Sequence, residues 1–282
     1  PGLRPGHAGR QPRPRLGRVA QSIYITSAEG HTGKSSIALG VLDSLSRVTP
    51  KVGVFRPVSR STVERDYILE MLLDHDGVGL DYEDCVGVTY DDVRNDPDAA
   101  LSRIVQRYKA VEAQCDAVVI VGSDFTDVGS PAELGYNARI AVNLGAPVLL
   151  VLGGRDQQGH SEQLGASTPR TPEQMGQITA LTLAELASVH ADLFAIIANR
   201  ADPDNLVEVV EAIKGVAGDV PVWALPEDRF LVAPSMRDVL RALGGTMLKG
   251  DPELMTREVL GVVVAGMSPN NVLPRITERA VM

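Results

Sequence analysis

Short runs of apolar residues alternate along this chain with longer stretches in which apolar residues recur at helical spacing. The runs, which favour β-strands, lie at 23–25, 51–55, 116–121, 147–152, 194–198 and 220–225. The longer stretches, which favour helices, lie at 34–47, 62–75, 97–114, 131–143, 172–190 and 203–215. The sequence AVVIV at 117–121 is apolar throughout, as expected of a strand that is buried on both faces. Strands that alternate with helices predict an α/β fold with a doubly wound, mainly parallel sheet.

Two internal regions interrupt this pattern. Residues 76–96 are acidic and irregular, with a short strand expected near 86–88. Residues 153–171 form a polar stretch containing Gly and Gln, which is long for a connection within a compact domain. We therefore expect 153–171 to be either a lid or a disordered insert.

Both ends of the chain differ from the alternating part. Residues 1–20 are rich in Pro, Gly and Arg, which predicts a disordered leader. After residue 226 the alternation stops, and we expect a short helix at 235–243 and the opening of another at 268–282. Because this last pattern has no capping residue or polar tail, we expect a domain that is cut short. The predicted organisation is a leader at 1–20, an α/β domain at 21–248 and a truncated domain at 249–282.

The stretch SAEGHTGKSS at 27–36 lies between the first strand and the first helix. The order strand, glycine loop, helix is typical of a phosphate-binding loop, in which N–H groups at a helix N-terminus attract phosphate oxygens. The usual pattern is G-x-x-x-x-G-K-[S/T], but its first position is Ala28 here. The loop therefore either binds a nucleotide or another phosphate, or keeps the backbone shape and binds nothing. The predicted contacts to a bound nucleotide come from Gly30, His31, Thr32, Gly33, Lys34, Ser35 and Ser36.

A magnesium ion is the expected companion of a bound nucleotide. Lys34 would reach the outer phosphates, and the Ser35 hydroxyl would hold Mg²⁺. Asp66 and Asp124 are candidates to add carboxylate oxygens to the Mg²⁺ site. Asp124 follows a buried strand, where a Walker-B-type acid belongs, although Asp is also favoured there as a turn or capping residue. Asp66 falls within an expected helix, where a solvated surface carboxylate is the ordinary alternative.

Other polar residues follow the strands at the edge where ligands bind in such sheets. Arg56 follows the second strand and is expected to contact a phosphate or an acidic ligand. Asn199 follows the fifth strand and is expected either to contact the edge of a purine base or to form a turn. The same rule brings Ser123, Gly153 and Gly154 to this edge.

The overall composition limits the kinds of partner. The chain has 282 residues and a formal net charge of −9, which argues against nucleic acid because phosphate backbones need a basic surface. Cys85 and Cys115 are far apart in the sequence and are expected to be buried thiols. No apolar run reaches the ~20 residues that span a bilayer, so we expect no membrane partner and a cytoplasmic location. The histidines are scattered without the spacing of metal ligands.

Several longer stretches resemble the N-terminal part of long-form, actinobacterial-type phosphate acetyltransferases. They include GHTGKSSIALGVLDSL at 30–45, KVGVFRPVSRS at 51–61, ERDYILEMLL at 64–73, CDAVVIVGSDFTDVGSPAELGYNARIAVNLGAPVLL at 115–150 and REVLGVVVAGMSPNNVLPRITERAV at 257–281. For 21–248 the resemblance implies a P-loop NTPase fold similar to that of dethiobiotin synthetases. It also implies that a so-called DRTGG domain begins near residue 250.

The same resemblance implies a function for the parent protein, the conversion of acetyl-CoA and phosphate into acetyl phosphate and CoA. It places this chemistry, and acetyl-CoA itself, in a C-terminal domain outside this chain, so no catalytic residue is assigned here. For this chain it implies a regulatory and assembly domain that binds ATP, another nucleotide or a metabolite, with Mg²⁺. We expect a homo-oligomer in the full-length protein.

Two other functions stay open. One is a stand-alone ATP-dependent carboxylate ligase of the dethiobiotin synthetase or cobyrinic-acid amide synthase type. Dethiobiotin synthetases carry a lysine after the second strand and a glutamate at the end of the third, where this chain has Arg56 and Val121, and an apolar residue cannot bind Mg²⁺. The other is an assembly switch similar to the P-loop partitioning proteins, whose signature lysine is absent at Ala28 and Glu29.

Overall fold

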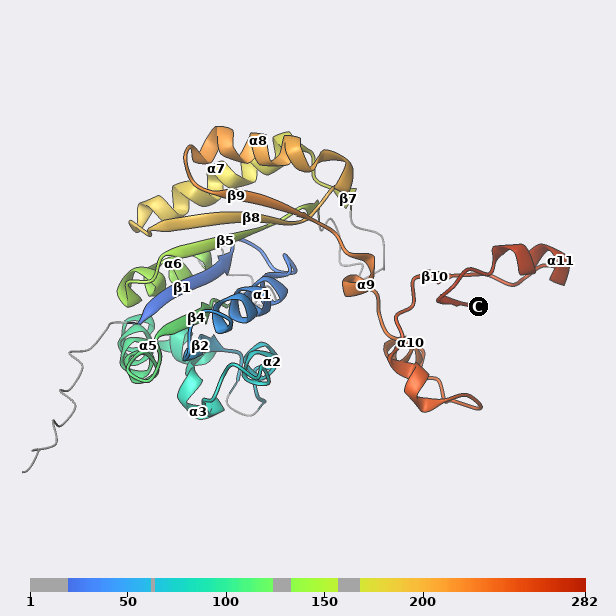
Figure 1. The fold of residues 1–282 in the computed structure, drawn as a ribbon, viewed down its shortest axis with the longest axis horizontal. Coiled ribbons are helices and arrows are strands. Elements are labelled where there is room, and N and C mark those ends of the chain that lie inside the picture. Colours follow the sequence, from blue (N-terminus) through green and yellow to red (C-terminus); the bar gives the residue numbers. More distant parts are fainter. Residues whose placement is uncertain (1–19, 62–63, 124–132, 157–167) are drawn as a thin grey trace, which may run out of the picture. The chain divides into compact units, whose positions relative to one another are not determined.

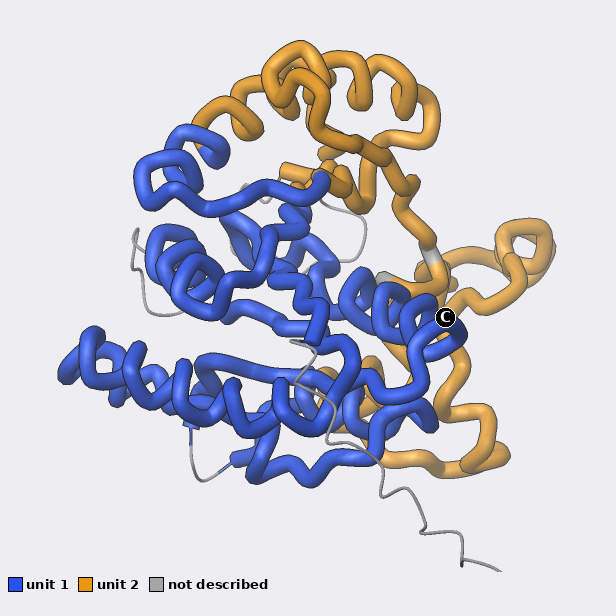
Figure 2. The backbone as a smooth tube through the Cα atoms, turned by 60° about the vertical axis from the view of Figure 1, so that its left-hand side comes forward, with its two compact units in different colours: residues 1–151, 182–195 blue, residues 152–181, 196–282 orange. Residues whose placement is uncertain are grey.

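The computed structural model describes residues 20–61, 64–123, 133–156 and 168–282. The chain divides into two compact units (Figure 2), which comprise residues 1–151 with 182–195 and residues 152–181 with 196–282. Most of the predicted leader lies outside the described residues, as does the greater part of the predicted lid or insert at 153–171.

Seven strands form one sheet in the order β3-β2-β4-β1-β5-β8-β9 (Figure 1). The strand pairs β1–β4, β1–β5, β2–β3, β2–β4 and β8–β9 are all parallel. The predicted α/β fold with a mainly parallel sheet is confirmed. The strands are β1 (Gln21–Ser27), β2 (Val52–Ser59), β3 (Val86–Thr89), β4 (Ala117–Val121), β5 (Val148–Gly153), β8 (Leu193–Ala201) and β9 (Val222–Pro226).

The first unit is built on the central strands of this sheet. All residues of β2 and β4 are buried, as the unbroken apolar runs predicted for strands with helices on both faces. Helix α5 (Pro97–Glu112) buries Leu101, Ile104, Tyr108 and Val111, which recur every three or four residues and so share one side of the helix. The other long helices of this unit are α1 (Lys34–Ser46) and α6 (Glu133–Leu144).

The segment expected to be irregular at 76–96 is more ordered than predicted. The short strand expected near 86–88 is present as β3, and the segment also contains the helices α3 (Tyr82–Cys85) and α4 (Tyr90–Asn95). Helix α4 begins with a capping box, in which Thr89 Oγ1 accepts from the backbone N–H of Asp92 and the Asp92 carboxylate accepts from that of Thr89. Local caps therefore supply the order that the apolar pattern does not show. The helix expected at 62–75 begins later, as α2 (Tyr67–Leu73), because the Asp66 side chain caps it.

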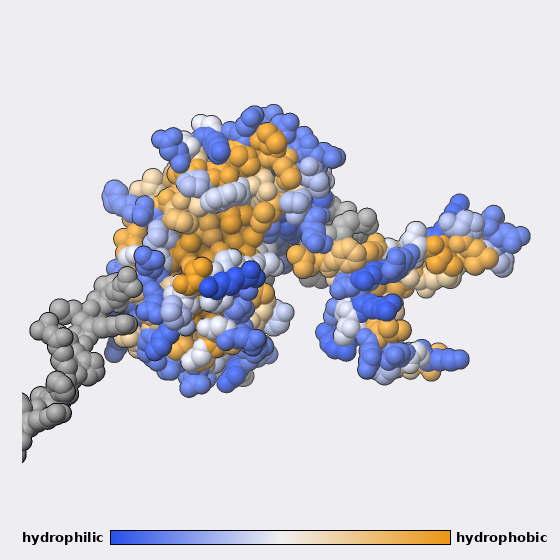
Figure 3. Space-filling view, in the orientation of Figure 1, coloured by the Kyte–Doolittle hydropathy of each residue, from blue (hydrophilic) through white to orange (hydrophobic). Residues whose placement is uncertain are grey.

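The second unit contains most of β8, together with β9 and α8 (Leu206–Ala217). Helix α8 buries Val209 and Ile213. Trp223 and Leu225 on β9 are 51% and 40% exposed, and Figure 3 shows hydrophobic side chains gathered over β8 and β9. Helix α7 (Pro172–Ser188) begins in this unit, and the short strands β6 (Arg155–Asp156) and β7 (Thr168–Pro169) pair within the stretch predicted as a loop.

Residues 227–282 form short elements with little core of their own. Val259 and Val272 are buried, whereas many larger apolar side chains of this segment, such as Leu248, are exposed. The helix expected to open at 268–282 is limited to α11 (Pro269–Val272), because the 3₁₀ turn at Leu273–Arg275 and the strand β11 (Ala280–Val281) follow it. The remaining elements are α9 (Arg229–Val232), α10 (Met236–Ala242), β10 (Gly261–Val262) and the 3₁₀ turns at Pro203–Asn205 and Pro252–Thr256.

The boundary at residue 248, between the two domains expected from the sequence, stays a prediction.

Within the described ranges, no helix is both long enough and apolar enough to cross a bilayer.

Candidate phosphate-binding site

The glycine loop connects β1 to α1, as the sequence predicted. Gly33 occupies the N-cap position of α1 with φ 79°, in the left-handed region that glycine adopts without a Cβ penalty, and it supplies no side-chain cap. His31 is also left-handed, with φ 55°, which is uncommon for a residue that carries a side chain. Ser27 Oγ donates to the carbonyl of Glu29 at 2.8 Å and closes the start of the loop. The backbone thus makes the tight turn that a phosphate-binding loop requires.

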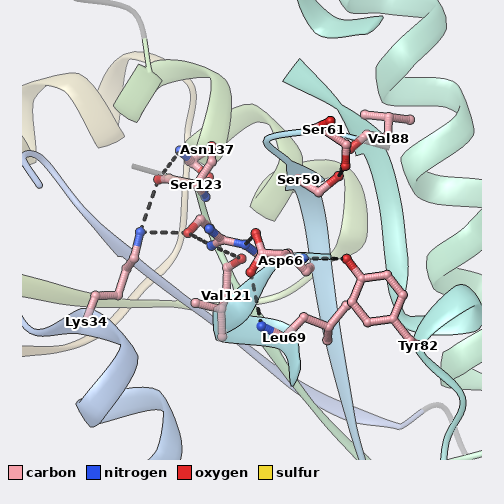
Figure 4. Close-up of polar contacts among 12 residues, drawn as sticks. Lys34, Ser59, Ser61, Asp66, Leu69, Tyr82, Val88, Val121, Ser123 and Asn137 are labelled. Carbon is pink, nitrogen blue, oxygen red and sulfur yellow. Dashed lines mark hydrogen bonds and ion pairs between the residues drawn. The ribbon is translucent and has the colours of Figure 1, made fainter. Parts of the chain in front are cut away.

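Lys34 is the first residue of α1 and is only 1% exposed. Its Nζ donates to the carbonyl oxygens of Gly122 at 2.6 Å and Ser123 at 3.1 Å, just beyond the end of β4 (Figure 4). Ser35, the predicted Mg²⁺ ligand, is half-buried beside it. Of the other predicted contacts, Gly30 and Thr32 are buried, Gly33 is half-buried, and His31 and Ser36 are exposed.

Arg56 meets Lys34 at the same strand end. The Arg56 guanidinium is buried, and its Nη1 donates to the carbonyl oxygens of Val121 at 3.1 Å and Gly122. Its Nε donates to Asp66 Oδ2 at 3.0 Å in a buried ion pair (Figure 4). The predicted ligand contact Arg56 and the predicted metal ligand Asp66 are therefore brought together, as partners of each other.

Both carboxylate oxygens of Asp66 take part in local structure. Oδ2 pairs with Arg56, and Oδ1 accepts from the backbone N–H of Leu69 at 3.1 Å as the N-cap of α2. The backbone N–H of Asp66 donates to the Tyr82 hydroxyl at 2.7 Å, and burial raises the pKa of Tyr82. A Mg²⁺ ion at Asp66 would have to share these oxygens with Arg56 and the helix.

A third polar group reaches the end of β4 from α6. Asn137 is completely buried, and its Oδ1 accepts from the Tyr24 hydroxyl at 2.7 Å and from the backbone N–H of Ser123 at 3.1 Å. Its Nδ2 donates to the carbonyl oxygens of Ser123 at 3.2 Å and Glu133 at 2.9 Å. Sequence reasoning missed this residue. The available signal was an Asn among the apolar positions that α6 turns towards the core.

Two predicted site residues remain, Asp124 and Asn199. Asp124 lies outside the described residues. Asn199 belongs to β8 in the second unit, where its carbonyl accepts from the Gly154 N–H at 2.7 Å. A Cβ on Gly154 would lie 2.5 Å from Ala201 Cα, so the close approach of these two segments requires glycine there.

The second unit also contains an ion-pair cluster that the sequence did not predict. Glu227 pairs with Arg200 and with Arg155, each at 2.6 Å, and all three side chains are largely buried. Across the parts of the chain that the structure describes, no group of three or more His, Cys, Asp or Glu residues is arranged to hold a metal ion.

The groups at the start of α1 are of the kind that binds anions. A left-handed glycine at the start of a helix, a lysine in its first turn and a following serine are the groups that hold phosphates and their Mg²⁺ in phosphate-binding loops.

The sequence profile of a protein family described as an AAA domain matches residues 21–235. The chain belongs to this AAA-domain family. The match includes the glycine loop, Arg56, Asp66, Asn137 and Asn199.

Two relatives of this AAA domain are named phosphate acetyltransferase. The protein from Nitratidesulfovibrio vulgaris is 32% identical over 267 residues, covering 92% of this chain and 37% of the relative. The protein from Synechocystis sp. is 25% identical over 244 residues, covering 82% of this chain and 33% of the relative. The chain thus spans about a third of the length of the curated relatives that it matches.

Among solved structures, the AAA domain is similar to the MinD cell division protein of Aquifex aeolicus. The TM-score is 0.47 and the identity 16%, with 76% of this chain and 85% of that chain covered.

Proposed function

We propose that this AAA domain binds a nucleotide or another phosphate-bearing metabolite at the loop formed by residues 30–36. The observation that carries the proposal is the position of Lys34, a buried residue that begins α1 directly after a left-handed Gly33. Both the helix N-terminus and the lysine favour an anion at this place. Ser35 would hold the accompanying Mg²⁺, and its half-buried position in the first turn of α1 agrees with that role.

In the whole protein, we assign this domain a regulatory and assembly role in a phosphate acetyltransferase. The names of the two relatives support a parent protein that transfers an acetyl group between CoA and phosphate. Acetyl-CoA would bind to another part of that protein. Ligand binding here would change activity only if the ligand favours one of two states of the parent protein.

The assembly role rests on a second observation. Trp223 and Leu225 present large apolar side chains to solvent from an edge strand of the sheet. Exposed apolar clusters of this kind mark protein–protein contacts, and we assign this one to a second copy of the chain. Sedimentation velocity tests the assignment. Replacement of Trp223 by Ser should shift an oligomer towards monomer, and an unchanged distribution would remove this strand from the interface.

A stand-alone carboxylate ligase is disfavoured by the contacts of Arg56 and Asp66. Such an enzyme would use Asp66 as a carboxylate for Mg²⁺, and the ligases that it resembles carry a lysine at the position of Arg56. Here the two side chains are buried and paired with each other at 3.0 Å. Measurement of ATP hydrolysis with and without diaminopelargonate tests the point, because stimulation by that substrate would restore the ligase function.

Calorimetric titration of the chain with MgATP, MgADP, NADH and CoA tests the proposed function. Binding of at least one of these with a one-to-one stoichiometry is expected. An absence of heat with all four at high protein concentration would leave a scaffold without a ligand.

A further inference from the structure

The backbone N–H and carbonyl of Ser123, just beyond the end of β4, are both hydrogen-bonded to side chains. Lys34 Nζ donates to the Ser123 carbonyl at 3.1 Å, and Asn137 Nδ2 donates to the same oxygen at 3.2 Å. Asn137 Oδ1 also accepts from the Ser123 N–H at 3.1 Å. Asn137 therefore holds the backbone of Ser123 by two hydrogen bonds, one donated by its Nδ2 and one accepted by its Oδ1 (Figure 4).

The orientation of the Asn137 amide is fixed by its partners. A backbone N–H can only donate and a backbone carbonyl can only accept. Ser123 N–H must therefore face Oδ1, while the carbonyls of Ser123 and Glu133 must face Nδ2. The hydroxyl of Tyr24 completes the set by donating to Oδ1 at 2.7 Å, and burial raises the pKa of Tyr24, which keeps that proton in place. In a flipped amide, Nδ2 would face the N–H of Ser123 and Oδ1 would face the carbonyl oxygens of Ser123 and Glu133, so these hydrogen bonds would be lost.

The backbone of Gly122 is packed closely against the Asn137 side chain. A Cβ on Gly122 would lie 2.5 Å from Asn137 Oδ1, so the strand exit is pressed directly against the amide. The carbonyl of Gly122 is the other oxygen to which Lys34 donates, at 2.6 Å. Both oxygens that orient the lysine thus belong to residues that Asn137 contacts.

We propose that Asn137 is a positioning residue for the phosphate site. It fixes the two carbonyl oxygens beyond β4, and these oxygens hold the Lys34 ammonium group in place. This inference rests on the proposed function, since it concerns the affinity of that same site. It also links α6 to the loop. A ligand that draws Lys34 away from Ser123 removes one of the two hydrogen bonds that the Ser123 carbonyl accepts, and Asn137 on α6 donates the other.

Replacement of Asn137 by Asp tests the inference. The change keeps the shape of the side chain but turns the donor facing the carbonyls of Ser123 and Glu133 into an acceptor. Titration calorimetry with MgADP as the probe should give a dissociation constant about tenfold higher than that of the wild type. Asn143→Asp is the matched control, because Asn143 lies on the same helix, is exposed and donates to the carbonyl of Arg139 in the preceding turn. This control should bind like the wild type.

A double-mutant cycle separates positioning from a general loss of structure. If Asn137 acts through the lysine, Asn137→Asp should have little effect in a chain that already carries Lys34→Ala. A merely structural role predicts the same loss in both backgrounds. Where Asn137→Asp does not fold, Tyr24→Phe replaces it in the cycle, with an expected loss of about threefold that again depends on Lys34.

The outcomes are distinct. No binding of MgADP by the wild type overturns the proposed function for this probe, and the inference with it. Binding by the wild type with an unchanged dissociation constant in the folded Asn137 variant, or with equal losses in both backgrounds, overturns the inference alone.

Discussion

Lys34 and Arg56 donate to one and the same carbonyl oxygen, that of Gly122. The lysine reaches it from the first turn of α1 and the arginine from β2, and both residues are 1% exposed. The carboxylate of Asp66 offsets one of the two positive charges through its ion pair with Arg56. Charges taken out of water in this way must be paired and hydrogen-bonded, so each member of the set depends on the others.

Replacement of Arg56 by Leu is expected to destabilise the protein by about 3–5 kcal/mol, because it leaves the buried Asp66 carboxylate without its partner. Urea unfolding followed by circular dichroism measures the change. The double variant Arg56→Leu with Asp66→Leu should recover part of the loss, since it removes both charges. The control is Arg47→Leu, which breaks an exposed pair with Asp43 and should cost less than about 1 kcal/mol. Equal stabilities of Arg56→Leu and Arg47→Leu would contradict the account.

A second prediction concerns Gly154. An added Cβ would lie 2.5 Å from Ala201 Cα and 2.6 Å from its N, and backbone atoms cannot yield as a side chain can. Gly154→Ala should therefore lower the free energy of unfolding by about 1–3 kcal/mol. Gly40→Ala offers the contrast, because Gly40 lies inside α1 with nothing within 4 Å of its Cβ position. That change should stabilise the protein by about 0.5–1 kcal/mol, and a loss at both sites would count against the packing described here.

The capping box of α4 predicts a pH dependence. Hydrogen bonds from the Thr89 backbone and hydroxyl and from the Arg103 guanidinium lower the pKa of Asp92 from 3.8 to about 2. A carboxyl whose pKa falls on folding stabilises the folded state above its unfolded pKa, and this contribution is lost as the pH falls towards its folded pKa. The stability gap between the wild type and Asp92→Asn should therefore be constant at neutral pH and should close between about pH 4 and pH 2. Thermal melts of both proteins across that range measure it, and a gap that stays constant down to pH 2 would refute the assignment.

The alternating pattern was enough to predict the sheet and its long helices. Runs such as AVVIV at 117–121 need burial on both faces, and that need alone places helices around a parallel sheet. The short strand expected near 86–88 is present as β3. Helix α4 was not predicted, because hydrogen bonds between Thr89 and Asp92 determine its start and apolar spacing does not. The opening of a helix at 268–282 was wrong in extent, since a short apolar segment alone does not distinguish α-helix from 3₁₀ turn or strand.

The sequence predicted the glycine loop of the candidate site but not the side-chain contacts around it. The order of Gly33, Lys34 and Ser35 after a strand is a local signal that the sequence shows directly. The meeting of Arg56 with Asp66, and of Asn137 with Ser123, depends on how helices α2 and α6 cross the ends of the strands. Such contacts between distant parts of the chain leave only a weak trace in a single sequence, here a polar Asn on an apolar helix face.

The central claim is that Lys34 belongs to a phosphate site, and one measurement tests it directly. MgADP is titrated by calorimetry into the wild type, into Lys34→Ala and into Lys109→Ala, a control that removes an exposed lysine paired with Glu112. The account predicts binding by the wild type and the control, and a dissociation constant at least about tenfold higher for Lys34→Ala. Equal affinity of Lys34→Ala and the wild type would contradict it.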